Sequence, residues 1–378
     1  MLITLPQAEG ARECLSYYIP FVIYALPGSD KTRFMASLPD DRGESHPDID
    51  RDRSGDCFFI SRFASDEPYM AGVNDVMDEE QVIAYIAAHP DIRFDEPCER
   101  PALTSTRRVS YDEAFRAMTR RLQKEGGKVV LSRHETLFSE RDIIDVAEEY
   151  FRLSPQAFRY LCFTPETGAW LGATPELLLE SVPGSDEIRT MALAGSRPTG
   201  DTPHEWDSKN LQEHEVVVKF ITDTLTAHGL EVTAQPVGEL QAGPVTHLCT
   251  HITARGDLHN VGPIINDLNP TPAVAGWPRP LAIAEIDAYE THQRRCYGGI
   301  VGIRTAGVLH VYVNLRCAFV APFLYDGRDG WVYNLYAGGG LMPDSVLDDE
   351  WAETQRKMQA LRSCIRNATP DPAQGVYI

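Results

Sequence analysis

Residues 209–220 read KNLQEHEVVVKF, in which a polar segment runs directly into an apolar one. Val216, Val217 and Phe220 recur with the spacing of one face of a buried helix. Glu213 stands just before this face, on the first turns of the predicted helix. Its carboxylate is therefore expected to be held rigidly beside the protein core.

A second acidic group lies far along the chain, in the segment DDEWAETQRK at 348–357. Glu350 and Glu353 are three residues apart and share one face of a helix. Carboxylates on two rigid helices would suit a hard cation such as Mg²⁺, which takes oxygen ligands and retains several waters. Two solvated helix faces would give the same pattern, so the spacing by itself leaves both interpretations open.

Composition limits the class of protein. The 378 residues are 43% hydrophobic, enough for a large core in one big domain or two smaller ones. The net charge of −20 argues against nucleic acid or an anionic membrane as the main partner. An anionic substrate would need a locally positive pocket. The eight cysteines form no CxxC pair, and no transmembrane run or signal peptide is visible, which favours a cytoplasmic protein with free thiols.

The strand-like segments come in hairpins rather than alternating strictly with helices. One predicted hairpin joins FRYLCF (158–163) to AWLGATPELLLE (169–180). The pattern indicates an α+β fold of one intertwined domain, with large antiparallel sheets and helices packed outside. Residues 1–105 are expected to form an N-terminal scaffold within this domain, 106–365 the catalytic region and 366–378 a C-terminal tail. Helices are predicted at 79–88, 110–127, 140–153, 209–228 and from about 345, and a loop at 40–56.

Two kinds of short motif predict local structure more specifically than the hydrophobic pattern does. Ser110 and Glu113 have the spacing of a capping box that opens the second predicted helix. The segments ALAGSR and LYAGGGLM resemble glycine turns, whose N–H groups could bind an anionic oxygen or could simply form tight turns.

Two ionisable residues stand at the head of apolar runs. Lys128 opens the strand KVVLSR, and Glu176 opens the run ELLLE. Lys128 would be an exposed strand end or a desolvated general base. Glu176 would be a satisfied turn residue, or a partly buried carboxyl with a raised pKa that acts as a general acid.

Many segments together resemble one family. GKVVLSR, LGATPELLLE, MALAGSR, SKNLQEHEVVVKFI, THLCTHITARG, LNPTPAVAGWPRPLA, YGGIVG, VNLRCA and YAGGGLMPDSVLDDEWAETQRK occur in the order found in chorismate-utilising enzymes. The resemblance covers roughly residues 110–360. It implies a chorismate-binding fold like that of anthranilate synthase component I, with chorismate as a small-molecule substrate.

The resemblance also implies roles for individual residues. Glu213, Glu350 and Glu353 match the positions that hold Mg²⁺, and the ion would bind the ring carboxylate of chorismate. Arg316 matches an arginine that grips a substrate carboxylate through its bidentate fork. The other implied substrate contacts are Gly195, Ser196, His247, Thr271, Ala273, Tyr297, Gly338, Gly339 and Gly340.

Two positions indicate the branch of the family. Ala194 stands where aminodeoxychorismate synthases commonly carry a nucleophilic lysine. Lys128 is present where the ammonia-using anthranilate synthases typically lack a lysine. The resemblance therefore implies an isochorismate synthase, in which Lys128 deprotonates the water added at C2 and Glu176 protonates the departing C4 hydroxyl.

Several alternatives remain open. A salicylate synthase shares both residues and then eliminates pyruvate from isochorismate. Asn269, Ala275 and Arg295 depart from the family pattern and leave the fate of the product open. A non-catalytic chorismate-binding subunit would be expected to lack Lys128 or Glu176. An amination complex would need an amidotransferase domain or partner, and none is expected. Menaquinone synthesis is the expected pathway, with catechol siderophores as the alternative.

Overall fold

The computed structural model describes residues 1–38, 55–64, 70–92, 94, 96–97, 99–200 and 205–366. Most of the predicted loop at 40–56 and almost all of the predicted tail at 366–378 lie outside the described residues. Among the described residues, no helix is long and apolar enough to cross a membrane.

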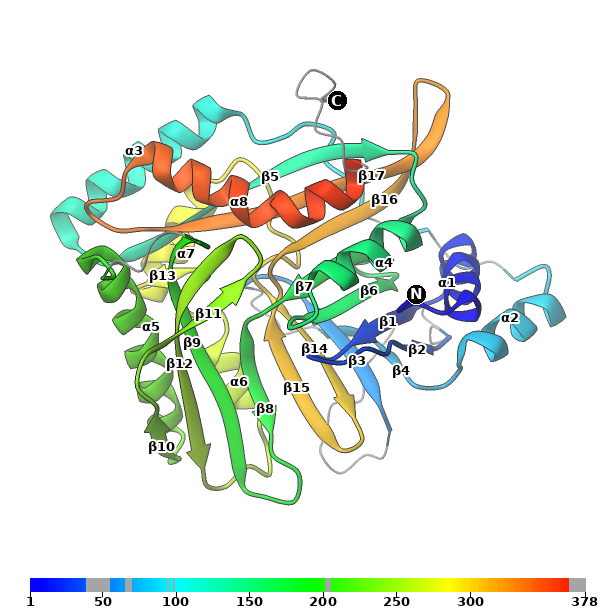
Figure 1. Ribbon diagram of the computed structural model, residues 1–378, viewed down its shortest axis with the longest axis horizontal. Helices are drawn as coiled ribbons and strands as arrows, with labels where there is room; N and C mark the ends of the chain where they lie inside the picture. Colours follow the sequence, from blue (N-terminus) through cyan, green and yellow to red (C-terminus); the bar gives the residue numbers. More distant parts are fainter. Residues whose placement is uncertain are drawn as a thin grey trace.

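Two large antiparallel sheets form the body of the protein (Figure 1). Sheet A has eight strands in the order β13-β5-β17-β16-β7-β6-β1-β2, and sheet B has the order β10-β12-β9-β8-β15-β14-β3-β4, with β11 paired to β12. The strands of sheet A are β13 (Gly276–Trp277), β5 (Lys128–Ser139), β17 (Arg328–Leu341), β16 (Cys317–Tyr325), β7 (Gly168–Thr174), β6 (Phe158–Thr164), β1 (Phe21–Ala25) and β2 (Arg33–Ala36). Those of sheet B are β10 (Glu231–Ala234), β12 (Val245–Arg255), β9 (Glu187–Pro198), β8 (Leu177–Ser181), β15 (Val308–Val313), β14 (Ile300–Thr305), β3 (Cys57–Ser61), β4 (Met70–Asn74) and β11 (Gly238–Ala242).

Helices cover the outer faces of both sheets. One apolar cluster joins sheet A to α1 (Leu5–Tyr17), α2 (Glu79–Ala88), α4 (Ile143–Leu153) and α8 (Leu347–Arg366). A second cluster joins sheet B to α5 (Ser208–Ala227) and α6 (Gly262–Leu268). A third, rich in aromatic side chains, lies between the sheets, and a fourth packs α3 (Arg108–Glu125) and α7 (Arg279–Tyr289) against β5. The predicted α+β class, with antiparallel sheets inside and helices outside, is confirmed.

The predicted helices are all present, but one predicted cap is wrong. Helix α3 begins at Arg108 after Arg107, and no side chain caps it. Ser110 and Glu113 therefore lie inside the first turns rather than at the boundary. Helix α5 instead has a real N-cap, because Asp207 accepts a hydrogen bond from the backbone N–H of Asn210.

The sequence had suggested a single strand for the segment AWLGATPELLLE, but the structure divides it between two strands. Strand β7 ends at Thr174 in sheet A and β8 begins at Leu177 in sheet B. Pro175 and Glu176 form the crossover between the sheets, where Pro175 removes a backbone donor and favours a break. The backbone N–H of Val313 donates to the Glu176 carbonyl over 3.0 Å, which ties this crossover to β15.

The two predicted glycine turns are also wrong. Gly338–Gly340 lie within β17, paired to β5, and Gly195 lies within β9 beside a bulge in its pairing with β12. Glycine is needed there for close approach and not for a turn. A Cβ on Gly340 would stand 2.1 Å from Glu213 Oε1, and one on Gly338 would stand 2.9 Å from the side chain of Val130. Gly195 also has a φ of +75°.

Candidate active site

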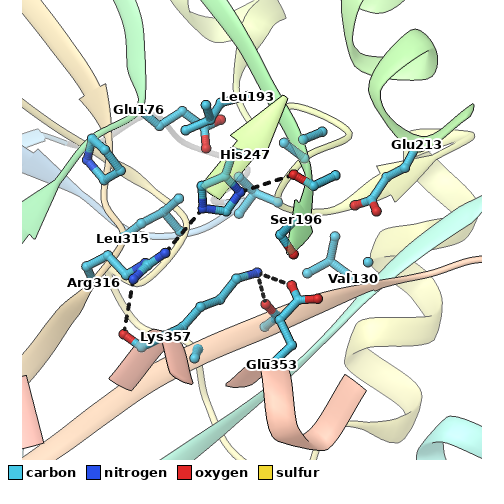
Figure 2. Close-up of a pocket in the computed structure, with 18 of the residues that line it drawn as sticks. Val130, Glu176, Leu193, Ser196, Glu213, His247, Leu315, Arg316, Glu353 and Lys357 are labelled. Atoms are coloured by element: carbon cyan, nitrogen blue, oxygen red, sulfur yellow. Dashed lines mark hydrogen bonds and ion pairs between the residues drawn. The ribbon is translucent and has the colours of Figure 1, made fainter. Parts of the chain in front are cut away.

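A cavity opens where both sheets meet α5 and α8, with about 640 Å³ of empty space including the solvent at its mouth (Figure 2). Eleven of the predicted site residues line it: Glu176, Gly195, Ser196, Glu213, His247, Ala273, Tyr297, Arg316, Gly338, Gly340 and Glu353. Lys128, Thr271, Gly339 and Glu350 are buried behind this lining or beside it.

Glu176 reaches the cavity from the crossover between the sheets. Its side chain is almost fully buried and forms no ion pair with any residue that the structure describes. Burial raises the pKa of its carboxyl to about 7, and the charges of Lys128 and Lys357 oppose this shift without cancelling it. A carboxyl of this kind holds a proton near neutral pH and can give it to a leaving group.

Lys128 is the first residue of β5 and is fully buried. Its ammonium lies 2.9 Å from Glu213 Oε1, close enough for an ion pair, although the geometry is not that of a hydrogen bond. Glu213 comes from α5, where it shares the buried face with His214 and Val217. The buried face of the helix differs from the predicted one. Val217 is buried as predicted, but Val216 is only half-buried.

The two glutamates of α8 are also paired with lysines. Lys209 of α5 donates to Glu350 Oε1 over 2.5 Å, and Lys357 forms a 2.6 Å ion pair with Glu353 one turn earlier on the same helix. Burial and the nearby charge of Glu353 raise the pKa of the Glu350 carboxyl. Burial opposes ionisation of Glu353 as well, but Lys357 outweighs it and holds the pKa of Glu353 below its usual range.

The three glutamates do not converge on one point. Within the described ranges, no group of three or more His, Cys, Asp or Glu side chains is placed to hold a metal ion. Two observations nonetheless suit a hard cation. The donors are all carboxylates, and Glu350 Oε2 is buried with no hydrogen-bond partner while Oε1 accepts from Lys209 and Ser345.

His247 and Arg316 form another part of the cavity wall. Arg316 donates through Nη2 to His247 Nε2 over 3.2 Å, and His247 Nδ1 lies 3.3 Å from the Gly195 carbonyl (Figure 2). Because a guanidinium can only donate, Nε2 must be the acceptor and Nδ1 must carry the proton. Burial and the charge of Arg316 lower the pKa of His247 to about 3, so the ring is neutral.

The backbone of Arg316 is strained. Its φ is +51°, a left-handed conformation that costs a non-glycine residue roughly 1–3 kcal/mol. The conformation is held by two bonds to its carbonyl, from the Ala173 N–H and the Tyr150 hydroxyl. This backbone conformation directs the guanidinium into the cavity, where it can bind a carboxylate.

Sequence reasoning missed two cations of the site, Lys209 and Lys357. Each stands four residues from a predicted metal ligand, Lys209 before Glu213 and Lys357 after Glu353. That spacing places the pairs on one helix face and could have indicated both. It would still have given Lys209 the wrong partner, since its ammonium crosses to Glu350 on another helix.

The chain matches one protein family over most of its length. The family model described as "Chorismate binding enzyme" matches residues 58–366. The "Salicylate biosynthesis isochorismate synthase" of Pseudomonas aeruginosa is 33% identical over 256 residues, which are 63% of this chain and 51% of that protein. "Isochorismate synthase MenF" of Escherichia coli is 31% identical over 216 residues, which are 55% of this chain and 48% of that protein. The chain thus spans about half the length of the curated relatives it matches.

Solved structures show the same fold. The menaquinone-specific isochorismate synthase MenF from Escherichia coli superimposes with a TM-score of 0.68 and 22% identity, covering 92% of this chain and 89% of that one. Anthranilate synthase component I from Streptococcus pneumoniae superimposes with a TM-score of 0.61 and 15% identity, covering 90% and 92% of the two chains.

Proposed function

The chain belongs to the chorismate-binding enzymes, and from this premise we propose that it is an isochorismate synthase. The observation that carries the proposal is Glu176, a carboxyl without an ion-pair partner among the described residues, with a pKa raised to about 7. It stands in a cavity whose other charges are those of lysines, an arginine and lysine-paired glutamates. This is the state expected of a general acid.

The charges around the cavity explain how an acidic protein could bind a dianion. Lys357 and Arg316 line the cavity, and Lys128 and Lys209 lie behind it. With Glu176 protonated, these four cations face only three carboxylates. The local field is therefore positive although the whole chain carries a net charge of −20.

The proposed reaction adds water at C2 of chorismate and releases the C4 hydroxyl. Lys128, once it has released its own proton, takes a proton from the water as the oxygen–C2 bond forms. The ring double bond shifts, the C4–oxygen bond breaks, and Glu176 gives its proton to the departing hydroxyl. Water is consumed and water is released, so the step is an isomerisation of chorismate to isochorismate.

We assign Glu213, Glu350 and Glu353 as the residues that would hold Mg²⁺. The bound ion would supply a template for the substrate and offset carboxylate charge. Arg316 would grip a second carboxylate. Gly195, Ser196, His247, Thr271, Ala273, Tyr297 and Gly338–Gly340 are assigned to substrate contact or to the shape of the pocket.

The wider assignments rest on the same premise. Residues 106–365 form the catalytic region, 1–105 a scaffold within the same domain and 366–378 a tail. We propose a cytoplasmic enzyme without an obligatory amidotransferase partner, acting in menaquinone synthesis. The identity to a salicylate-pathway relative makes salicylate or siderophore synthesis the second candidate.

The test is product identification. Purified protein is incubated with chorismate and Mg²⁺, and the products are separated by chromatography. Isochorismate alone is the expected result, and EDTA should stop its formation. Salicylate with pyruvate would move the assignment to salicylate synthase, and anthranilate formed only with ammonia would refute the addition of water. Activity indifferent to EDTA would remove Mg²⁺ from the mechanism.

A further inference from the structure

Strand β5 carries Lys128, and one of its edges is only partly covered. β17 pairs with β5 along one edge from Val129 to Ser139. On the other edge, β13 pairs only with Lys128 and Val129. The Val130 N–H still reaches the Ala275 carbonyl over 2.9 Å. Beyond this bond, the Val130 carbonyl and the Ser132 N–H face no strand that the structure describes, and buried backbone groups of this kind need partners.

Two charged side chains supply these partners. Arg294 Nη2 donates to the Val130 carbonyl over 2.7 Å, and Glu290 Oε1 accepts from the Ser132 N–H over 2.7 Å. Arg294 also grips Glu290 with two bonds of 2.6 and 2.8 Å. The ion pair therefore presents a donor and an acceptor to β5 in the positions where a further strand would present them.

Arg294 also bonds to two other segments that line the cavity. Arg294 Nη1 donates to the Val274 carbonyl over 2.9 Å, and the Arg294 carbonyl accepts from the Tyr297 N–H over 2.9 Å. Val130, Val274 and Tyr297 all line the cavity. The buried guanidinium thus connects two segments that line the cavity, those of Val130 and Val274, and the backbone of Arg294 is bonded to the third. The guanidinium lies against the strand that delivers Lys128.

We propose that Arg294 and Glu290 are positioning residues, which replace a missing strand and fix the wall of the active site relative to Lys128. The proposal deepens the proposed function, since it assumes that this cavity binds chorismate. Both side chains are about 2–3% exposed. A buried ion pair is costly unless every group is satisfied, and here the hydrogen bonds to three backbone groups supply that compensation.

Arg294→Lys is the first variant, because a lysine keeps the charge but cannot reach Glu290 and two carbonyls from one plane. A displacement of about 1 Å can cost a hundredfold in rate, so we expect kcat/KM for chorismate to fall by about 10- to 100-fold. Most of the loss should be in kcat. Amide hydrogen exchange at Ser132 should become at least about tenfold faster, since its acceptor is no longer held.

Arg159→Lys is the matched control. Arg159 is also buried and also donates to three backbone carbonyls, those of Phe151, Leu26 and Ser29, but it does not line the cavity. Its variant should lower the thermal unfolding midpoint and leave kcat/KM within about twofold of wild type. If Arg294→Lys does no more than this control, the pair is only structural and the proposal is overturned.

Glu290→Gln serves as a second, isosteric variant in case Arg294→Lys fails to fold. It should show the same faster exchange at Ser132 and a smaller fall in kcat, and an unchanged kcat would refute the proposal. Exchange at Ser132 in the wild-type protein is measured without substrate. Failure of wild-type protein to convert chorismate would overturn the proposed function, whereas an unprotected Ser132 amide would overturn this inference independently.

Discussion

Glu176 and Glu353 line the same cavity from opposite sides and are in opposite electrostatic states. Glu176 sits on a crossover between the sheets with no ion-pair partner among the described residues, and burial raises its pKa to about 7. Glu353 sits on α8, one turn from Lys357, which holds its pKa low despite burial. Burial penalises the charge on both carboxyls, and only Glu353 has an ammonium close enough to offset that penalty.

The contrast shows how one residue type can serve two purposes in one pocket. A neutral carboxyl can donate a proton, and an ionised one can bind a cation or fix a neighbouring lysine. The division depends on whether a lysine lies beside the carboxyl rather than on the glutamate itself.

Removing the carboxyl of Glu176 should have the largest effect. Glu176→Gln keeps the shape but has no proton to give, so kcat should fall by about 100- to 10,000-fold, the usual contribution of a general acid. Steady-state turnover of chorismate measures this, with chorismate affinity as the check that binding survives. Retention of a tenth or more of the wild-type rate would show that Glu176 is not the acid.

Removing Lys357, the partner of Glu353, should lower the stability of the folded protein. Lys357→Met leaves a buried carboxylate without its ammonium, and breaking such a pair typically costs about 3–5 kcal/mol. Urea unfolding at pH 7 measures the change. Lys219→Met on α5 is the matched control, because Lys219 pairs with Asp223 on the solvent side and its loss should cost under about 1 kcal/mol. Equal effects of the two variants would contradict the contrast.

The pH dependence of stability should have opposite signs for the two carboxyls. The folded-state pKa of Glu176 lies above the unfolded value of about 4.5, so its contribution to stability is lost as pH rises from about 4.5 to 7. The free energy of unfolding of Glu176→Gln, relative to that of wild type, should therefore rise across that window by about 3 kcal/mol in total. Unfolding of both proteins at pH 4.5, 6 and 8 tests this, and a difference independent of pH would mean that Glu176 ionises normally.

The smallest effect is expected at Glu215. It lies two residues after Glu213 but is exposed on the solvent side of α5. Glu215→Gln should change kcat and KM by no more than about twofold and the free energy of unfolding by less than about 0.5 kcal/mol. A larger fall in Mg²⁺ affinity would place Glu215 in the metal site and require a different orientation of the helix.

The sequence was a good guide to elements and a poor one to their boundaries at the site. Helix α2 was predicted at its observed bounds, since its period and flanking residues are local signals. Helix α1 was missed although Thr4 and Gln7 form a capping box, because its buried face consists of small residues such as Ala8, Ala11 and Cys14 and gives a weak apolar signal. The glycines of β17 were interpreted as a turn, since a glycine needed for close approach to Glu213 looks the same in sequence as one needed for a bend.

The sequence by itself determined the family, through the order of its motifs, and with it the residue types available to the chemistry. Lys128, Glu176 and the three glutamates could all be named before any coordinates. The tertiary structure alone decided that Lys209 pairs with Glu350 and Lys128 with Glu213, and that Glu176 lies between two sheets without a counter-ion among the described residues. Ion pairing and pKa depend on burial and on neighbours from distant segments, such as Lys209 beside Glu350, and neither quantity is encoded in local spacing.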